Sequence, residues 1–156
     1  MLSYLCTDDQ TANPPIPLPS FPSRETEDRS LLGKRTVIVE DEGITQLQLS
    51  RILRSEGIKV VGTASNGQEG LEFVLKERPD FVLMDIRMPV MDGLEATERI
   101  LAEYRVCIVI LTAFSDEESQ QRALELGACA YVLKPVTAET LIPQLKAAYH
   151  NFHPAL

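Results

Sequence analysis

From residue 34 onward, short apolar runs alternate with longer stretches in which apolar residues recur every three or four positions. A short run rich in β-branched residues is typical of a buried strand, whereas the longer spacing is typical of an amphipathic helix. The pattern therefore predicts strands that alternate with helices. The predicted strands are TVIVE (36–40), KVVGT (59–63), FVLMD (81–85), CIVIL (107–111) and YVL (131–133).

Helical spacing follows each of these runs and would place apolar side chains on one face of a helix. Residues 141–152 follow the spacing of one helix face closely, and Gly127 suits the end of the fourth helix. The other residues expected to face the core are Ile44, Leu47, Ile52 and Leu53, then Leu71, Val74 and Leu75, then Leu94, Ile100, Leu101 and Tyr104, and finally Ala123, Leu124 and Leu126.

This alternation predicts an α/β fold built from parallel βαβ units, with helices on both faces of one doubly wound sheet.

A chain of 156 residues with 44% hydrophobic and 24% charged residues suits one soluble domain. The net charge of −8 argues against general affinity for nucleic acid or anionic membranes. The longest apolar run is too short to span a bilayer, and no basic signal segment begins the chain.

The composition changes near residue 34. The segment PPIPLPSFP (14–22) is rich in proline and lacks strand or helix periodicity. We expect a disordered or polyproline-II tail over residues 1–33, a folded domain over 34–150 and a short tail over 151–156. A solubilising or vestigial tail is favoured over a proline-rich ligand for a groove-type domain.

Three cysteines lack metal-ligand spacing. Cys107 and Cys129 lie in apolar runs, where a free cysteine behaves as a small buried hydrophobe, and a reducing cytoplasm is the simplest location.

Polar residues end four of the five predicted strands. In a parallel sheet these ends lie on one edge, where ligands bind. If the first and third strands are neighbours, Asp41 and Asp85 would repel each other unless a cation such as Mg²⁺ held them, and Lys134 would neutralise part of the charge. A purely structural salt-bridge cluster is the alternative. Glu42 and Asp92 would cap the helices that follow them.

Four motifs occur in the order found in one family: EDE at 40–42, VLMDIRMPVMDG at 82–93, LTA at 111–113 and YVLKP at 131–135. Over about residues 34–150 the chain resembles the receiver domain of two-component response regulators. This resemblance implies a flavodoxin-like (βα)5 fold with strand order 2-1-3-4-5.

The receiver segment, residues 34–150, is similar to receivers fused to antiterminator RNA-binding output domains. The similarity lies in LTAFS and in the LIP start of the last helix. No output domain follows residue 150, so we expect a stand-alone receiver or a truncated sequence.

The resemblance also implies roles for site residues. Asp85 would be the phosphoacceptor, forming an aspartyl-phosphate. Mg²⁺ would be held by Asp41, Asp85 and the backbone carbonyl of Arg87, with Glu40 acting through water because it is longer than the family's usual aspartate. The groups expected to bind phosphoryl oxygens are the Thr112 hydroxyl, the Ala113 N–H and the Lys134 ammonium. The Lys134–Pro135 peptide stands where the family often has a cis bond.

Tyr131 matches the family's switch aromatic. When Thr112 is drawn toward a phosphoryl group, the ring would turn inward and reshape the face formed by the fourth helix, fifth strand and fifth helix, about residues 115–150. The implied partners are a histidine kinase or phosphotransfer protein and an unidentified downstream protein, with this face also suited to homodimers. Direct binding to nucleic acid or membranes is not expected. Phe114 would screen the phosphoryl group from water.

Two other functions remain as alternatives. A pseudo-receiver would act only through its surface, but it would typically have lost one of Asp41, Asp85, Thr112 or Lys134. A phosphatase with an aspartate nucleophile usually has a second acid two residues on, where this chain has Arg87. We therefore expect a signalling module that catalyses only its own phosphorylation and dephosphorylation, not a turnover enzyme.

Overall fold

The structure is a computed structural model that describes residues 29–113 and 115–152. Its sheet has five parallel strands in the order β3-β2-β4-β5-β6. This is the 2-1-3-4-5 order of the flavodoxin-like fold, so the predicted fold class is confirmed. Each strand lies within one residue of its predicted bounds: β2 (Arg35–Val39), β3 (Lys59–Ala64), β4 (Phe81–Asp85), β5 (Cys107–Thr112) and β6 (Ala130–Leu133).

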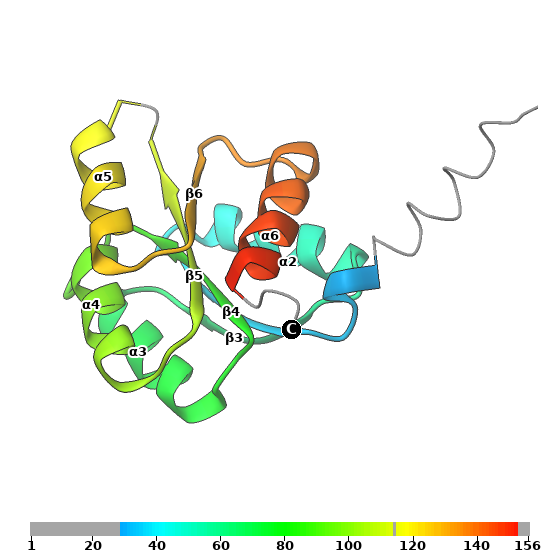
Figure 1. Cartoon of the computed structure of the whole chain (residues 1–156), viewed down its shortest axis with the longest axis horizontal. Coiled ribbons are helices and arrows are strands. Elements are labelled where there is room, and N and C mark those ends of the chain that lie inside the picture. The colour runs from blue at the N-terminus through cyan, green and yellow to red at the C-terminus, as the bar shows by residue number, and fades with distance from the viewer. Residues whose placement is uncertain (1–28, 114, 153–156) are drawn as a thin grey trace, which may run out of the picture. The chain divides into compact units, whose positions relative to one another are not determined.

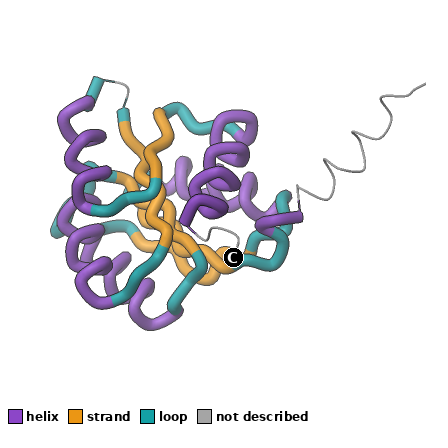
Figure 2. The backbone as a smooth tube through the Cα atoms, in the orientation of Figure 1, coloured by secondary structure: helices purple, strands orange, loops and turns teal. Residues whose placement is uncertain are grey.

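The helices form a layer on each face of the sheet (Figure 1). Three of them, α3 (Gly67–Glu77), α4 (Gly93–Glu103) and α5 (Glu117–Leu126), cover one face. The other face is covered by α2 (Gly43–Ser55) and α6 (Ala138–Phe152). The tube in Figure 2 shows α2, α3, α4 and α5 each returning the chain to the start of the next strand, as parallel strands require.

Side chains and glycine fix several helix ends. The Asp92 carboxylate accepts a hydrogen bond from Glu95 N at 2.8 Å, and Gly127 ends α5 with a φ of 114°, so both predictions for these residues are confirmed. Glu42 differs from the expectation. It occupies the N-cap position immediately before α2, but its carboxylate accepts from the Thr45 hydroxyl and makes no capping bond to a backbone N–H.

The core lies on both faces of the inner strands of the sheet, of which β4 and β5 are buried along their whole length. Fully burying an aliphatic side chain of this kind contributes about 1.5–3 kcal/mol to folding. The largest cluster packs strand residues such as Met84 and Ile110 against Val74 and Ile100 from α3 and α4. The site at the strand ends is therefore supported by the most buried part of the sheet.

Two of the predicted helix faces are wrong in part. In α2, Ile44 and Leu47 are 71% and 52% exposed, whereas Leu49 and Leu53 are buried. At about 100° per residue, Ile44 and Leu47 lie on the far side of the helix from the Leu49–Leu53 face. In α5, Ala123 is buried but Leu124 is 41% exposed. The expected core face of α6 is confirmed by the burial of Leu141, Ile142, Leu145 and Ala148.

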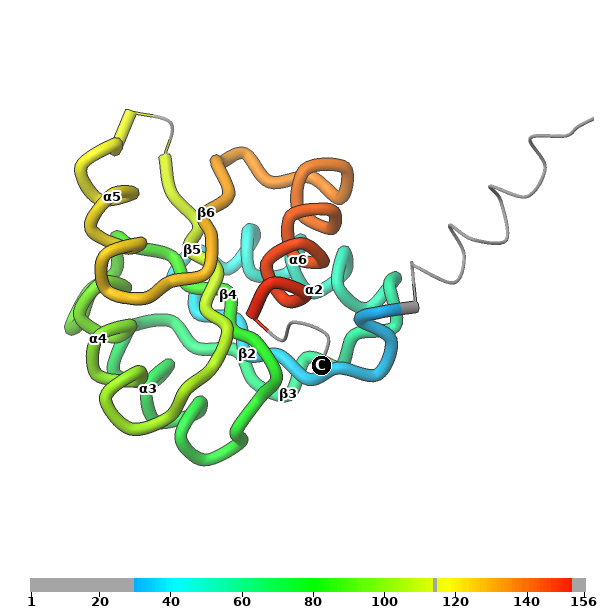
Figure 3. Tube along the Cα trace, viewed as in Figure 1, coloured from blue at the N-terminus to red at the C-terminus, as the bar shows by residue number. Residues whose placement is uncertain are grey.

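The ordered elements extend slightly past the predicted domain limits. A 3-10 helix, η2 (Arg29–Leu31), precedes residue 34, and α6 continues to Phe152. A compact unit begins at Gly33, next to the predicted boundary, and the course of its chain can be followed in Figure 3. Residues 1–28 and 153–156, on which most of the two tail predictions fall, lie outside the described residues. Over the described ranges, no helix combines the length and apolar character needed to cross a membrane.

Candidate functional site

The carboxyl ends of β2 and β4 bring three acidic side chains together. The two strands are paired with Val39 opposite Met84, so the residues that follow, Glu40 and Asp85, are level with each other. Glu40 and Asp85 are buried, at 1% and 6% exposure, whereas Asp41 is exposed. One carboxylate oxygen from each of the three residues lies within 4.8 Å of the others.

Lys134 lies between two of these acids. Its Nζ is 3.1 Å from Glu40 Oε1 and 3.1 Å from Asp85 Oδ1. The lysine is held at the end of β6 by its own N–H, which donates to the Thr112 carbonyl at 2.9 Å, and the Lys134–Pro135 peptide is cis. One ammonium group cannot balance three carboxylates, so the cluster keeps a negative charge that favours a bound cation.

The charges and burial of the site shift two pKa values. Burial raises the pKa of Glu40 and the neighbouring Asp85 charge raises it further, although the Glu42 N–H bond and Lys134 act in the opposite direction. Burial alone would lower the pKa of Lys134, but the charges of Asp85 and Glu40 outweigh that effect and raise it. Lys134 therefore remains an ammonium ion at neutral pH, suited to bind an anionic group.

The loop after β4 is held close to Asp85. Ile86 N donates to Asp85 Oδ1 at 2.9 Å, and Gly93 N donates to the Ile86 carbonyl at 2.7 Å. A Cβ atom at Gly93 would lie only 2.0 Å from the Asp85 carbonyl oxygen. Glycine is thus required at this position because the start of α4 packs directly against the backbone of Asp85.

Gln46 was not among the site residues predicted from the sequence. Its Nε2 donates to the carbonyls of Glu40 at 3.0 Å and Ala64 at 3.1 Å. These bonds tie the acid-bearing turn after β2 to the end of β3 and to α2. No sequence motif signals such a side chain, because its two acceptors are backbone atoms.

Two of the remaining predicted site residues, Thr112 and Arg87, line a cavity at the same strand ends. Thr112 is buried at the end of β5, and its hydroxyl makes only a long contact of 3.4 Å with the Ala113 carbonyl. The Arg87 side chain is 81% exposed and pairs with Asp116 Oδ2 at 3.4 Å, a contact the sequence did not predict. Tyr131 is a half-buried residue of β6. Phe114 lies outside the described residues.

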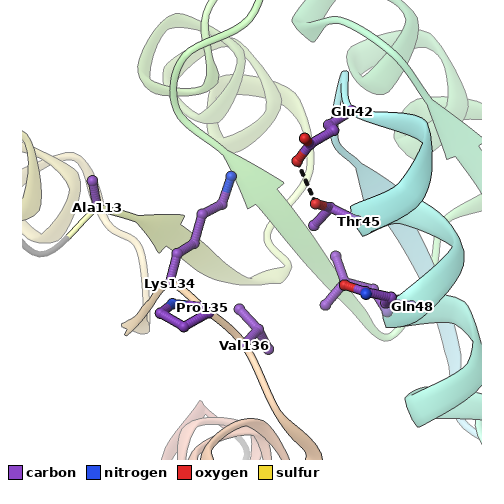
Figure 4. A pocket seen from close by; sticks show the side chains of 8 residues that line it. Glu42, Thr45, Gln48, Ala113, Lys134, Pro135 and Val136 are labelled. Carbon is purple, nitrogen blue, oxygen red and sulfur yellow. Dashed lines mark hydrogen bonds between the residues drawn. The ribbon is translucent and has the colours of Figure 1, made fainter.

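Two cavities open beside these side chains. The first, of about 470 Å³, is lined by the three acids together with Arg87, Thr112 and Lys134. The second, of about 370 Å³, lies between α2 and the segment after β6 and shares Glu42, Ala113 and Lys134 with the first. Figure 4 shows Lys134 on one side of this second cavity, with Glu42 and Thr45 across from it.

The sequence matches the family model described as the response regulator receiver domain over residues 36–146. It is 39% identical over 127 residues to the transcriptional regulatory protein PdtaR of Mycobacterium tuberculosis, a match that covers 81% of this chain and 62% of PdtaR. It is 40% identical over 110 residues to the transcriptional regulatory protein LnrK of Bacillus subtilis, covering 69% of this chain and 50% of LnrK. The chain thus spans less than two thirds of the length of these curated relatives.

Solved structures with the same fold include the response regulator domain of Thermotoga maritima CheB, with a TM-score of 0.70 and 26% identity over 80% of this chain and 98% of that one. The signal receiver domain of a modulated diguanylate cyclase from Desulfovibrio desulfuricans has a TM-score of 0.71 and 33% identity, covering 78% of this chain and 97% of that one. Sequence, fold and strand-end site agree, and the chain belongs to the response regulator receiver domain family.

Proposed function

We propose that this receiver is switched by phosphorylation of Asp85, with a histidine kinase or phosphotransfer protein as the phosphoryl donor. The observation that carries the proposal is the position of Asp85. Its carboxylate lines a cavity of about 470 Å³ that also contains acidic groups and the Lys134 ammonium. A carboxylate nucleophile with cationic groups beside it suits phosphoryl transfer, in which positioning and charge neutralisation supply most of the catalysis.

The acid cluster fits Mg²⁺, because the ligand atoms are carboxylate oxygens and all lie within 4.8 Å of one another. We assign Asp41, Asp85 and the Arg87 carbonyl as direct ligands. Glu40 is assigned to a water-mediated role, since both of its oxygens already have partners: Oε1 is paired with Lys134 Nζ at 3.1 Å, and Oε2 accepts from Glu42 N at 3.1 Å. When bound, the ion would supply positive charge that neutralises the phosphoryl oxygens.

The contacts of Asp85 also support an assignment of the attacking oxygen. Oδ1 accepts from Ile86 N at 2.9 Å and is paired with Lys134 Nζ at 3.1 Å. We therefore assign Oδ2 as the nucleophile. It forms the new bond to phosphorus as the bond from phosphorus to the donor histidine nitrogen breaks. The Lys134 ammonium, the Thr112 hydroxyl and the Ala113 N–H would then bind the phosphoryl oxygens.

A signal would leave the site through β5 and β6. Lys134 N donates to the Thr112 carbonyl at 2.9 Å, so the phosphoryl-binding ends of these two strands are directly connected. Movement of Thr112 toward a phosphoryl group would alter the packing of Tyr131 on β6 and the surface formed by α5, β6 and α6. We propose this surface as the one that a downstream protein, or a second copy of the chain, recognises.

The pseudo-receiver alternative predicts a different response to a phosphoryl analogue. We expect beryllofluoride with Mg²⁺ to shift NMR signals around Asp85 and along α5, β6 and α6, with size exclusion reporting any dimer. Asp85→Asn should abolish these shifts. If beryllofluoride produced no Mg²⁺-dependent change in the parent protein, the chain would act through its surface alone, and the proposal would be wrong.

A further inference from the structure

Two cysteines meet at the edge of the sheet opposite the acid cluster. Cys107 is the first residue of β5, and Cys129 directly precedes β6, the neighbouring parallel strand. Cys129 N donates to the carbonyl of Ile108, the residue after Cys107, at 2.8 Å. This bond holds the two backbones side by side, close enough for the two thiols to shift each other's pKa.

The two thiols are not equivalent. Cys107 is buried, whereas Cys129 is partly exposed. The hydrogen bond from Cys107 lowers the pKa of Cys129, burial opposes this, and the Ile108 backbone and the Arg105 charge lower it further. The same hydrogen bond, together with burial, raises the pKa of Cys107. Cys129 is therefore the accessible thiol and the one that more readily forms the nucleophilic thiolate.

We propose that Cys129 and Cys107 form a reversible thiol–disulfide site that reacts with low-molecular-weight disulfides. The Cys129 thiolate attacks one sulfur of the disulfide, forming a mixed disulfide and releasing one thiolate, which takes up a proton. Cys107 then loses its proton and attacks the Cys129 sulfur. The Cys107–Cys129 disulfide forms and the second small thiol leaves, so one small disulfide is reduced for each protein disulfide made.

The strand geometry allows such a bond. The register of β5 and β6 places Val109 opposite Ala130, so Cys129 is level with Ile108, one residue along from Cys107. With strands about 4.8 Å apart and a rise of about 3.3 Å per residue, this offset keeps the Cα atoms within the range of about 4.4–6.8 Å found for disulfide-bonded cysteines. The bond would join β5 to β6 at the ends remote from Thr112 and Lys134. This inference stands independently of the phosphorylation proposal, because neither cysteine contributes to the acid cluster.

The test uses the full chain carrying Cys6→Ser, so that Cys107 and Cys129 are the remaining thiols, treated with oxidised glutathione and followed by thiol titration and intact mass spectrometry. We expect both thiols to be lost without retained glutathione, and dithiothreitol to restore them. Cys107→Ser should stop at one glutathione adduct on Cys129, and Cys129→Ser should leave Cys107 unmodified.

The Cys6→Ser protein keeps both Cys107 and Cys129, and its reaction with oxidised glutathione tests the proposal. The result therefore does not depend on whether Cys107→Ser and Cys129→Ser fold. A stable glutathione adduct on Cys129 with Cys107 still titratable would overturn the proposal. So would no reaction under native conditions when the urea-unfolded chain reacts readily. Circular dichroism of each variant confirms that reactivities are compared between folded chains.

Discussion

Lys134 Nζ lies 3.1 Å from Asp85 Oδ1, although β5 separates the strands that end at these residues. The lysine side chain crosses the end of the intervening strand to reach the acid cluster. The same nitrogen contacts the buried Glu40 at 3.1 Å, so it is a shared counter-ion. Its removal should therefore affect folding as well as phosphoryl binding.

The first prediction concerns Lys134→Met measured without Mg²⁺. The change leaves Glu40 and Asp85 without their cation, and we expect a loss of about 1–3 kcal/mol in the free energy of unfolding, the usual cost of leaving buried polar groups unpaired. This loss of stability should be smaller than the loss for a fully buried ion pair, because the lysine side chain is 30% exposed. Urea denaturation measures the free energy of unfolding.

Added Mg²⁺ should recover more stability in Lys134→Met than in the parent protein, because the ion can replace the missing charge. Lys76→Met, at an exposed position on α3, is the matched control and should change little in either buffer. Equal stability of Lys134→Met and the parent in Mg²⁺-free buffer would show that the lysine is not the counter-ion of the cluster.

A second prediction compares two glycines that each begin a helix near the site, Gly93 in α4 and Gly43 in α2. Gly93→Ala would place a methyl group 2.0 Å from the Asp85 carbonyl oxygen, so the α4 start must move. We expect a loss of about 1–3 kcal/mol or more, as for other overpacked sites, measured by denaturant unfolding. Gly43→Ala, which meets nothing within 4 Å, should be neutral or stabilising by up to about 1 kcal/mol. Similar effects of the two variants would contradict the close approach at Gly93.

A third prediction tests whether Gln46 positions the acidic turn. Gln46→Ala removes two hydrogen bonds, to the Glu40 and Ala64 carbonyls, and should cost about 0.5–1.5 kcal/mol per bond. We also expect weaker Mg²⁺ binding in a calorimetric titration, because Asp41 follows Glu40 directly. Gln48→Ala, on the same helix but exposed, is the control. If Gln46→Ala lowered stability while Mg²⁺ affinity stayed at the parent value, Gln46 would be a structural residue only.

The sequence predicted the strands and the edge of the sheet that carries the site, because both follow from local patterns. Alternating runs define parallel strands, and the residue after each run must lie at the carboxyl edge. Asp85, Thr112 and Lys134 could be placed together on that basis alone. The sequence could not predict that Lys134 pairs with Glu40 and not with Asp41, because this pairing depends on which strand-end carboxylate turns inward.

The wrongly assigned helix faces and the contacts that the sequence did not predict have a similar origin. Ile44 and Leu47 are apolar but face away from the sheet, so their helix face could not be assigned from hydrophobicity alone. The Gln46–Ala64 hydrogen bond and the Arg87–Asp116 pair join residues 18 and 29 positions apart in the sequence, and neither belongs to a motif. Such contacts become visible only when the elements are packed together.

The central claim is tested most directly by incubating the protein with Mg²⁺ and a small-molecule acyl phosphate, then measuring its intact mass and mapping the modified residue. We predict addition of one phosphoryl group on Asp85, dependence on Mg²⁺, and no addition in Asp85→Asn. Phosphorylation at another residue, or none in a protein shown to be folded and to bind Mg²⁺, would contradict the account.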